Sequence, residues 1–232
     1  MTITTRGKIL LGVLAVLVAV AVAVYYPGME GDPYSSDPEQ RLAAIRSLAG
    51  NTDAESLKIL RRLSDDSHRR VAFAAVNAIA QSPDSEPNRK VLLDILSGST
   101  SGVARSAAAA ALGKCPGADL TLLTRTLRDL DADPMVRAGA AKGLAKLPGG
   151  AVRGDRSTRP DPQVLKARLK IILPPLIEAL SDPDPRVRKW AITAIKRNTG
   201  IRFAFDADRQ VGQQRDRIRF IIETLRPQYA PE

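Results

Sequence analysis

The sequence predicts an all-α protein: a right-handed α-solenoid of about five helix pairs, preceded by one N-terminal transmembrane helix. The first observation is a nine-residue segment that recurs five times, with alanine as its fifth residue and leucine or isoleucine as its ninth. The second is spacing, because the copies start at residues 40, 71, 104, 136 and 187, in steps of 31, 33, 32 and 51. The third is an apolar run over residues 9–26. A pattern that returns at such a period is typical of stacked repeats.

Each copy of the segment predicts the first helix of a repeat. Its apolar fifth and ninth residues fall on one helical face. Its eighth residue is always serine, alanine or glycine, so a neighbouring helix can approach closely. Asp-Pro pairs at 37–38, 133–134 and 184–185 mark three of the starts. Aspartate can cap the first amides there, and proline fits the first turn because its missing N–H has no intrahelical partner.

A second helix is expected after each first helix, and stacking of the pairs must build the core because neither helix can bury its apolar face alone. The last step exceeds the one before it by 19 residues (51 minus 32), so the fourth repeat carries an insertion. Its loop is expected at about 148–162, among glycine, proline and arginine. The repeats then fill residues 37–226, with a tail at 227–232. The second helices are predicted over residues 53–63, 87–97, 117–130, 174–180 and 208–226.

Two of the copies resemble a known family of repeats. Residues 133–144 (Asp-Pro-Met-Val-Arg-Ala-Gly-Ala-Ala-Lys-Gly-Leu) and 184–195 (Asp-Pro-Arg-Val-Arg-Lys-Trp-Ala-Ile-Thr-Ala-Ile) are similar to short HEAT repeats of the phycobilisome-lyase-like kind. The second residue of the segment, arginine in four copies, belongs to that pattern and is expected to reach turn aspartates of adjacent repeats. The repeat at 71 departs, with Ala72 there and His68-Arg69 in place of Asp-Pro. The resemblance implies the fold, which hosts many functions.

The N-terminal run has the length and flanks of a membrane anchor. Residues 9–26 are apolar apart from Gly12 and two terminal tyrosines, and basic residues precede them. Eighteen helical residues at about 1.5 Å each span roughly 27 Å, close to the hydrocarbon thickness of a bilayer. We therefore expect a cytoplasmic tail (1–8), a signal anchor (9–26) and a linker (27–36), with the repeats outside the cytoplasm in a single-pass cell-membrane protein. The alternative is cleavage near Ala23, which would yield a secreted or periplasmic protein.

The formal net charge of +10 is concentrated in the C-terminal part. Residues 148–232 hold 17 basic and 10 acidic side chains, against 16 and 15 in residues 27–147. Such a surface suits an acidic protein partner, an anionic lipid or another polyanion, or is a solvated face whose arginines serve packing. Nucleic acid is not expected, because an exported chain rarely meets it. The candidate partner-binding residues are Arg61, Arg62, Arg125 and Arg128 on second helices, Lys189 with the single tryptophan Trp190, and Arg215 with Arg219 on the last helix.

The resemblance places second helices on the concave side, which is why their arginines are candidates. Trp190 lies just off the apolar stripe in a basic region. It is either a contact residue for a partner or a cover for the seam with the last helix.

Residues for catalysis or for holding a cofactor are scarce. His68 is the single histidine and Cys115 the single cysteine, which excludes an intramolecular disulfide and suggests a buried structural thiol. Recurring aspartates fit turns and helix caps better than a metal site. We therefore predict no enzymatic activity, no cofactor and no metal, and a function as a membrane-anchored protein–protein interaction scaffold or adaptor. The alternatives are polyanion or anionic-lipid binding through the basic C-terminal half, and a lyase-type activity that the resemblance alone implies.

Overall fold

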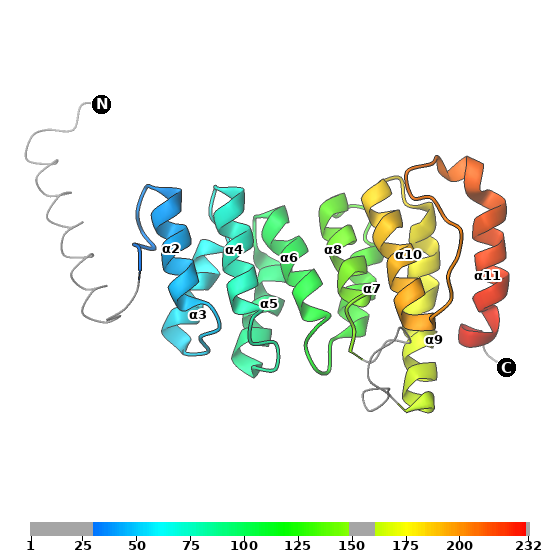
Figure 1. The fold of residues 1–232 in the computed structure, drawn as a ribbon, viewed down its shortest axis with the longest axis horizontal. Coiled ribbons are helices and arrows are strands. Elements are labelled where there is room, and N and C mark those ends of the chain that lie inside the picture. Colours follow the sequence, from blue (N-terminus) through cyan, green and yellow to red (C-terminus); the bar gives the residue numbers. More distant parts are fainter. Residues whose placement is uncertain (1–29, 149–160, 231–232) are drawn as a thin grey trace, which may run out of the picture.

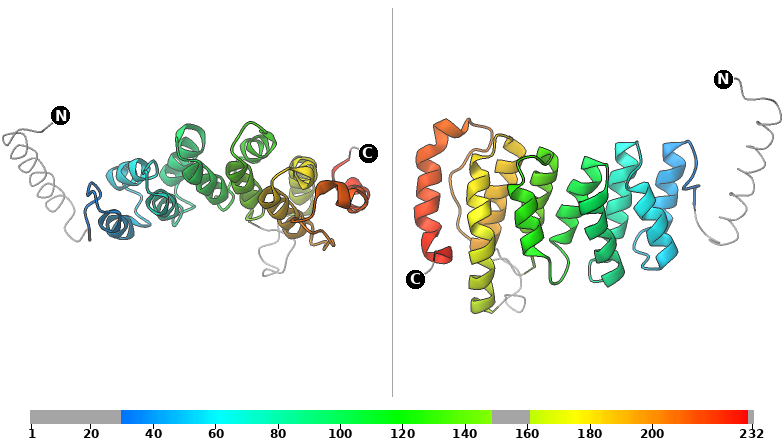
Figure 2. Two further views of the ribbon diagram at one scale, coloured as in Figure 1. Left: turned by 90° about the horizontal axis from the view of Figure 1, so that it is seen from above. Right: turned by 180° about the vertical axis from the view of Figure 1, so that it is seen from behind.

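The computed structural model of the chain describes residues 30–148 and 161–230. All its regular elements in these residues are helical, and the helices stack side by side in a row from one end of the chain to the other (Figure 1). Seen from above, first and second helices form two layers (Figure 2). The first helices are α2 (Pro38–Leu48), α4 (Arg69–Ile79), α6 (Gly102–Leu112), α8 (Pro134–Leu144) and α10 (Pro185–Thr199). The second helices are α3 (Ala54–Leu63), α5 (Glu86–Gly98), α7 (Leu120–Arg128), α9 (Pro162–Glu178) and α11 (Arg215–Tyr229).

The predicted first helices are confirmed in all five repeats, together with their start signals. Asp37, Asp133 and Asp184 each precede a proline and accept a hydrogen bond from the backbone N–H two residues on, at 3.0, 2.7 and 2.8 Å. In α6, Ser101 takes this role by accepting from the N–H of Ala104. His68 precedes α4 without a side-chain cap. The all-α repeat solenoid was therefore predictable from local signals.

The recurring alanines are packing residues, as the sequence predicted. The fifth residues of the five segments are all fully buried: Ala44, Ala75, Ala108, Ala140 and Ala191. Helices α6 and α8 approach each other closely, because Gly139 lies directly against the backbone of Ser106. A Cβ added at Gly139 would lie 2.7 Å from the Cα of Ser106 and closer still to its carbonyl oxygen. Small residues thus set the spacing of the first-helix layer.

Two predicted second helices were wrong in their bounds. The fourth, expected over 174–180, is the 17-residue α9, which contains Pro174 and Pro175 instead of starting at them. Its start is another Asp-Pro pair, in which Asp161 accepts from the N–H of Gln163 at 2.7 Å. Most of the loop expected at about 148–162 lies outside the described residues, and α9 begins at its C-terminal end. The fifth, expected from 208, begins at Arg215 after the 3₁₀ turn η3 (Val211–Gln214).

The expected membrane anchor at 9–26 and the tail before it lie outside the described residues. Among the residues that are described, no helix combines the length and the apolar character needed to cross a bilayer.

Candidate partner-binding surfaces

Two of the repeat arginines form the expected pairs with turn aspartates. Arg41 donates to Asp66 at 3.0 Å, and Arg137 donates two hydrogen bonds to Asp182, at 2.9 and 3.1 Å. Arg188 differs, because it donates to backbone carbonyls, including those of Asp182 at 2.7 Å and Ala207 at 2.8 Å. The Nε of Arg105 is buried with no hydrogen-bond partner in the described part of the chain. Arg41, Arg137 and Arg188 are therefore used within the solenoid and are not surface for a partner.

The candidate arginines of the second helices are largely engaged within the solenoid. Arg61 of α3 pairs with Asp65 at 2.6 Å and with Asp94 of α5. Burial acts to lower the pKa of Arg61, but the hydrogen bonds to Asp94 and Asp65 outweigh it and raise the pKa. Arg128 of α7 donates to both carboxylate oxygens of Glu178 in α9, at 2.6 and 2.7 Å, and this pairing raises its pKa. Both arginines therefore tie successive second helices together.

The other two second-helix candidates are exposed. The guanidinium carbon of Arg62 lies 4.4 Å from the centre of the Tyr34 ring, in a cation–π contact. Arg125 points to solvent from α7. Their availability to a partner stays a prediction.

At the C-terminal end, the candidates fall on two helices. Lys189 is exposed on α10, while Trp190 is half-buried there. The Nζ of Lys142, on α8, lies 5.1 Å from the centre of the Trp190 ring, so this tryptophan lies at the seam of α8 and α10. Arg215 and Arg219 are exposed one turn apart on α11. The structure does not bring these residues together with the second-helix arginines.

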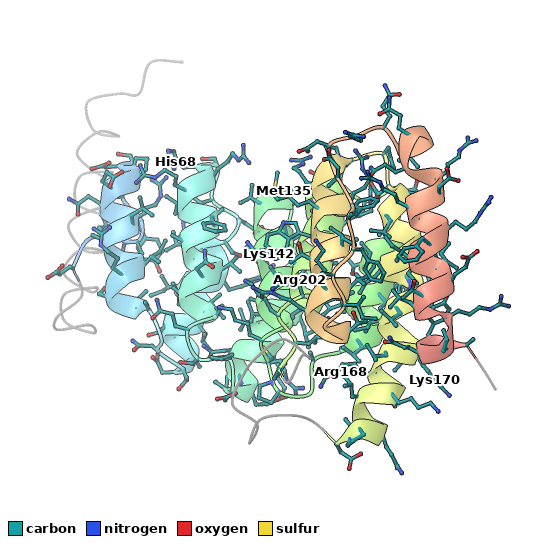
Figure 3. All side chains as sticks on the ribbon, turned by 45° about the vertical axis from the view of Figure 1, so that its right-hand side comes forward. His68, Met135, Lys142, Arg168, Lys170 and Arg202 are labelled. Atoms are coloured by element: carbon teal, nitrogen blue, oxygen red, sulfur yellow. The ribbon has the colours of Figure 1, made fainter. Side chains whose placement is uncertain are left out.

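A groove that the sequence reasoning missed opens in the first-helix layer, over α4, α6 and α8. Its volume is about 370 Å³. The floor is alanine, with Ala107, Ala110 and Ala111 of α6. Phe73 of α4 forms one wall and is 49% exposed, and Met135 and Lys142 of α8 form the other. Figure 3 shows Met135 and Lys142 one above the other between α4 and α10. We name this feature the first-helix groove.

Basic side chains surround the first-helix groove, and none of its lining residues is acidic. The cations are Arg69, Arg70, Lys114, Lys142 and Lys146. Arg70 has one exposed ion pair, with Glu39 at 3.2 Å. The pKa of Lys146 is lowered to about 8, first by burial and then by repulsion from Lys142, Lys114 and Arg197. Apart from the pair of Arg70 with Glu39, no carboxylate of the described residues forms an ion pair with these groove cations, which favours an anionic group from outside the chain.

The part of the chain that the structure describes contains no group of histidine, cysteine and acidic residues that could hold a metal ion. Cys115 is buried, and burial raises the pKa of its thiol, so the prediction of a structural cysteine is confirmed.

Comparison with known families identifies the repeats. A model of HEAT repeats matches residues 34–113, and a second HEAT-repeat model matches residues 172–197. The chain therefore contains HEAT repeats, and the matched residues lie within its stack of helix pairs. These matches do not distinguish the phycobilisome-lyase-like kind, which stays a prediction. No curated protein matches the chain.

Proposed function

We propose that this protein is a membrane-anchored scaffold or adaptor, whose right-handed HEAT-repeat solenoid holds a partner protein outside the cytoplasm. HEAT repeats generally mediate protein–protein interaction, and stacked repeats offer extended surfaces for it. The observation that carries the proposal is the first-helix groove, which joins an exposed phenylalanine, an alanine floor and five basic residues with no acidic one. Such a combination of apolar contact and uncompensated charge suits an acidic partner.

The partner is sought by crosslinking and pull-down from membranes of the native host. Wild type is compared with the groove variant Lys114→Glu/Lys142→Glu and with a matched control, Lys58→Glu/Lys90→Glu. The control changes the net charge equally, on the exposed faces of α3 and α5. We expect a specific crosslinked protein with wild type and with the control, and its loss with the groove variant. Equal recovery with all three proteins would contradict binding at the groove.

The membrane part of the proposal rests on the apolar run at residues 9–26 and its basic flank. Intact-mass measurement of the membrane fraction tests it, and we expect the mass of a chain that keeps this segment. Release of a soluble form that begins near Val24 would replace the anchor by a cleaved signal peptide.

A second candidate function, binding to an anionic lipid surface, is favoured by α11. Arg215, Arg219 and Arg226 are all exposed on this helix, as is Ile222. Because the first two lie four residues apart, they share a face. We expect Arg215→Glu/Arg219→Glu to weaken binding to vesicles that contain anionic lipid and to flatten its salt dependence. Unchanged vesicle binding by the double variant would show that these arginines are solvated and do not bind lipid.

A further inference from the structure

The first-helix groove has two basic ends. Arg69 and Arg70 stand at the beginning of α4, whereas Lys142 lies in the last turn of α8 and Lys146 just beyond it. Both helices have 11 residues, so at about 1.5 Å per residue the two ends lie roughly 16 Å apart along the helix direction. Figure 3 agrees, with His68 and Met135 near one end of the layer and Lys142 farther down.

The middle of the groove is apolar and shallow. The residues of α6 that line it are Val103, Ser106 and the three alanines, so only short side chains lie between the walls. Phe73 leaves about half of its surface in water beside this floor. An apolar side chain laid there would remove both surfaces from water, at about 25 cal/mol for each Å².

We propose that the first-helix groove binds an extended acidic segment of the partner protein, with carboxylates at both ends and a small apolar side chain on the alanine floor between them. The proposal rests on the scaffold function proposed above. An extended chain rises about 3.3 Å per residue, so roughly five residues span the 16 Å between the basic ends.

The electrostatics of the lower end support a carboxylate there. Lys146 is half-buried, and the charges that act on it, from Lys142, Lys114 and Arg197, are all positive. Burial and then this repulsion hold its pKa near 8, below the ordinary value of 10.5. A bound carboxylate would offset this repulsion, so the empty groove is less favourable for the lysines than the occupied one.

The test uses the full chain in detergent micelles and a fluorescein-labelled peptide, Asp-Asp-Ala-Val-Ala-Asp-Asp. Fluorescence anisotropy measures its Kd, and we expect saturable binding that weakens with salt. Lys114→Glu/Lys142→Glu should weaken binding by at least about tenfold, and Lys58→Glu/Lys90→Glu by less than about threefold. Should the charge reversal fail to fold, as judged by circular dichroism, Lys114→Gln/Lys142→Gln serves in its place.

Two further comparisons separate charge from shape. Replacing the central Ala-Val-Ala of the peptide by three glycines should cost several-fold in affinity, because the floor then gains no apolar contact. Ala110→Leu should also weaken binding, since a leucine would project into the groove without altering its charge. Equal binding of the glycine peptide, together with an unaffected Ala110→Leu variant, would overturn the proposal in favour of a general anion site. Vesicles of anionic lipid that bind through the same lysines, without competition from the peptide, would also overturn it.

Competition distinguishes this proposal from the scaffold function. The peptide should displace the crosslinked partner from wild type. Loss of the partner in the groove variant without displacement by the peptide would leave the scaffold function in place and refute the extended acidic segment. If the partner is crosslinked equally well by the groove variant and in the presence of the peptide, the groove is not the partner site.

Discussion

Replacing Arg137 by methionine should destabilise the C-terminal repeats more than any exposed arginine substitution. The side chains of Arg137 and Asp182 are each only 3% exposed, and two hydrogen bonds of 2.9 and 3.1 Å join them. The guanidinium also donates to the carbonyl oxygens of Leu130, at 3.3 Å, and Ala132, at 2.6 Å. One side chain therefore satisfies a buried carboxylate and two backbone acceptors.

The magnitude follows from what Arg137→Met leaves behind. Asp182 would remain a buried carboxylate, with a hydrogen bond from the N–H of Asp184 at 2.8 Å. Removing one partner of a buried pair in this way costs about 3–5 kcal/mol, mostly because the other charge is left uncompensated. The double variant Arg137→Met/Asp182→Leu removes both charges. It should be less destabilised than the sum of the single variants, by about 1–3 kcal/mol.

Urea unfolding, followed by fluorescence, is the measurement. Trp190 is the single tryptophan and lies at the seam of α8 and α10, so its signal reports the repeats that the ion pair joins. Arg186→Met is the matched control, because Arg186 pairs with Asp184 at 2.7 Å while 57% exposed. Exposed pairs of this kind contribute less than about 1 kcal/mol. Should Arg137→Met cost no more than this control, the reasoning from burial would be refuted.

Two further predictions concern packing and protonation. Gly139→Ala should cost at least about 1–3 kcal/mol in thermal or urea unfolding, because its Cβ would meet the backbone of Ser106. Gly98→Ala, whose Cβ would have one neighbour at 3.9 Å, should stay within about 0.5 kcal/mol of wild type; equal effects would contradict the close approach of α6 and α8. Between about pH 8 and 10.5, the unfolded chain holds more protons at Lys146 than the folded protein, so the free energy of unfolding should rise with pH relative to Lys146→Met. A constant difference between the two proteins across that window would show that Lys146 titrates normally.

The parts of the fold that could be predicted from sequence are those with local causes. Buried alanines such as Ala140 repeat at a fixed place in each first helix, and Asp-Pro pairs cap the helices that follow them. The Asp161-Pro162 pair at the start of α9 is the same signal. The sequence prediction nevertheless placed the start at Pro174, because it assumed a normal repeat period. A helix can contain two prolines when neighbouring elements support its irregular backbone, and the period alone does not show this.

The candidate site was less predictable, because ion pairs join residues far apart in sequence. Arg61 meets Asp94 across 33 residues, and Arg128 meets Glu178 across 50, so an arginine that looks exposed on a helical pattern can already be paired. The net charge of residues 27–147 is close to zero, so it did not indicate a basic groove within them. Their aspartates cap helices or pair with arginines, as Asp66 pairs with Arg41. Lys142 lies in the groove, whose lining contains no acidic residue.

The residues that pack α6 against α8 also explain why the groove lies there. Phe73 in α4 and Trp190 in α10, the third and the fourth residue of their repeat segments, keep part of their surface in water. In α6 the fourth residue is Ala107, and in α8 it is Gly139, because larger side chains would separate the two backbones. The groove lies beside this close approach, between Phe73 of α4 on one side and Met135 and Lys142 of α8 on the other. Gly139→Ala would disturb the packing of α8 on α6, whereas Ala110 lines the groove, so stability and partner binding can be tested at different positions.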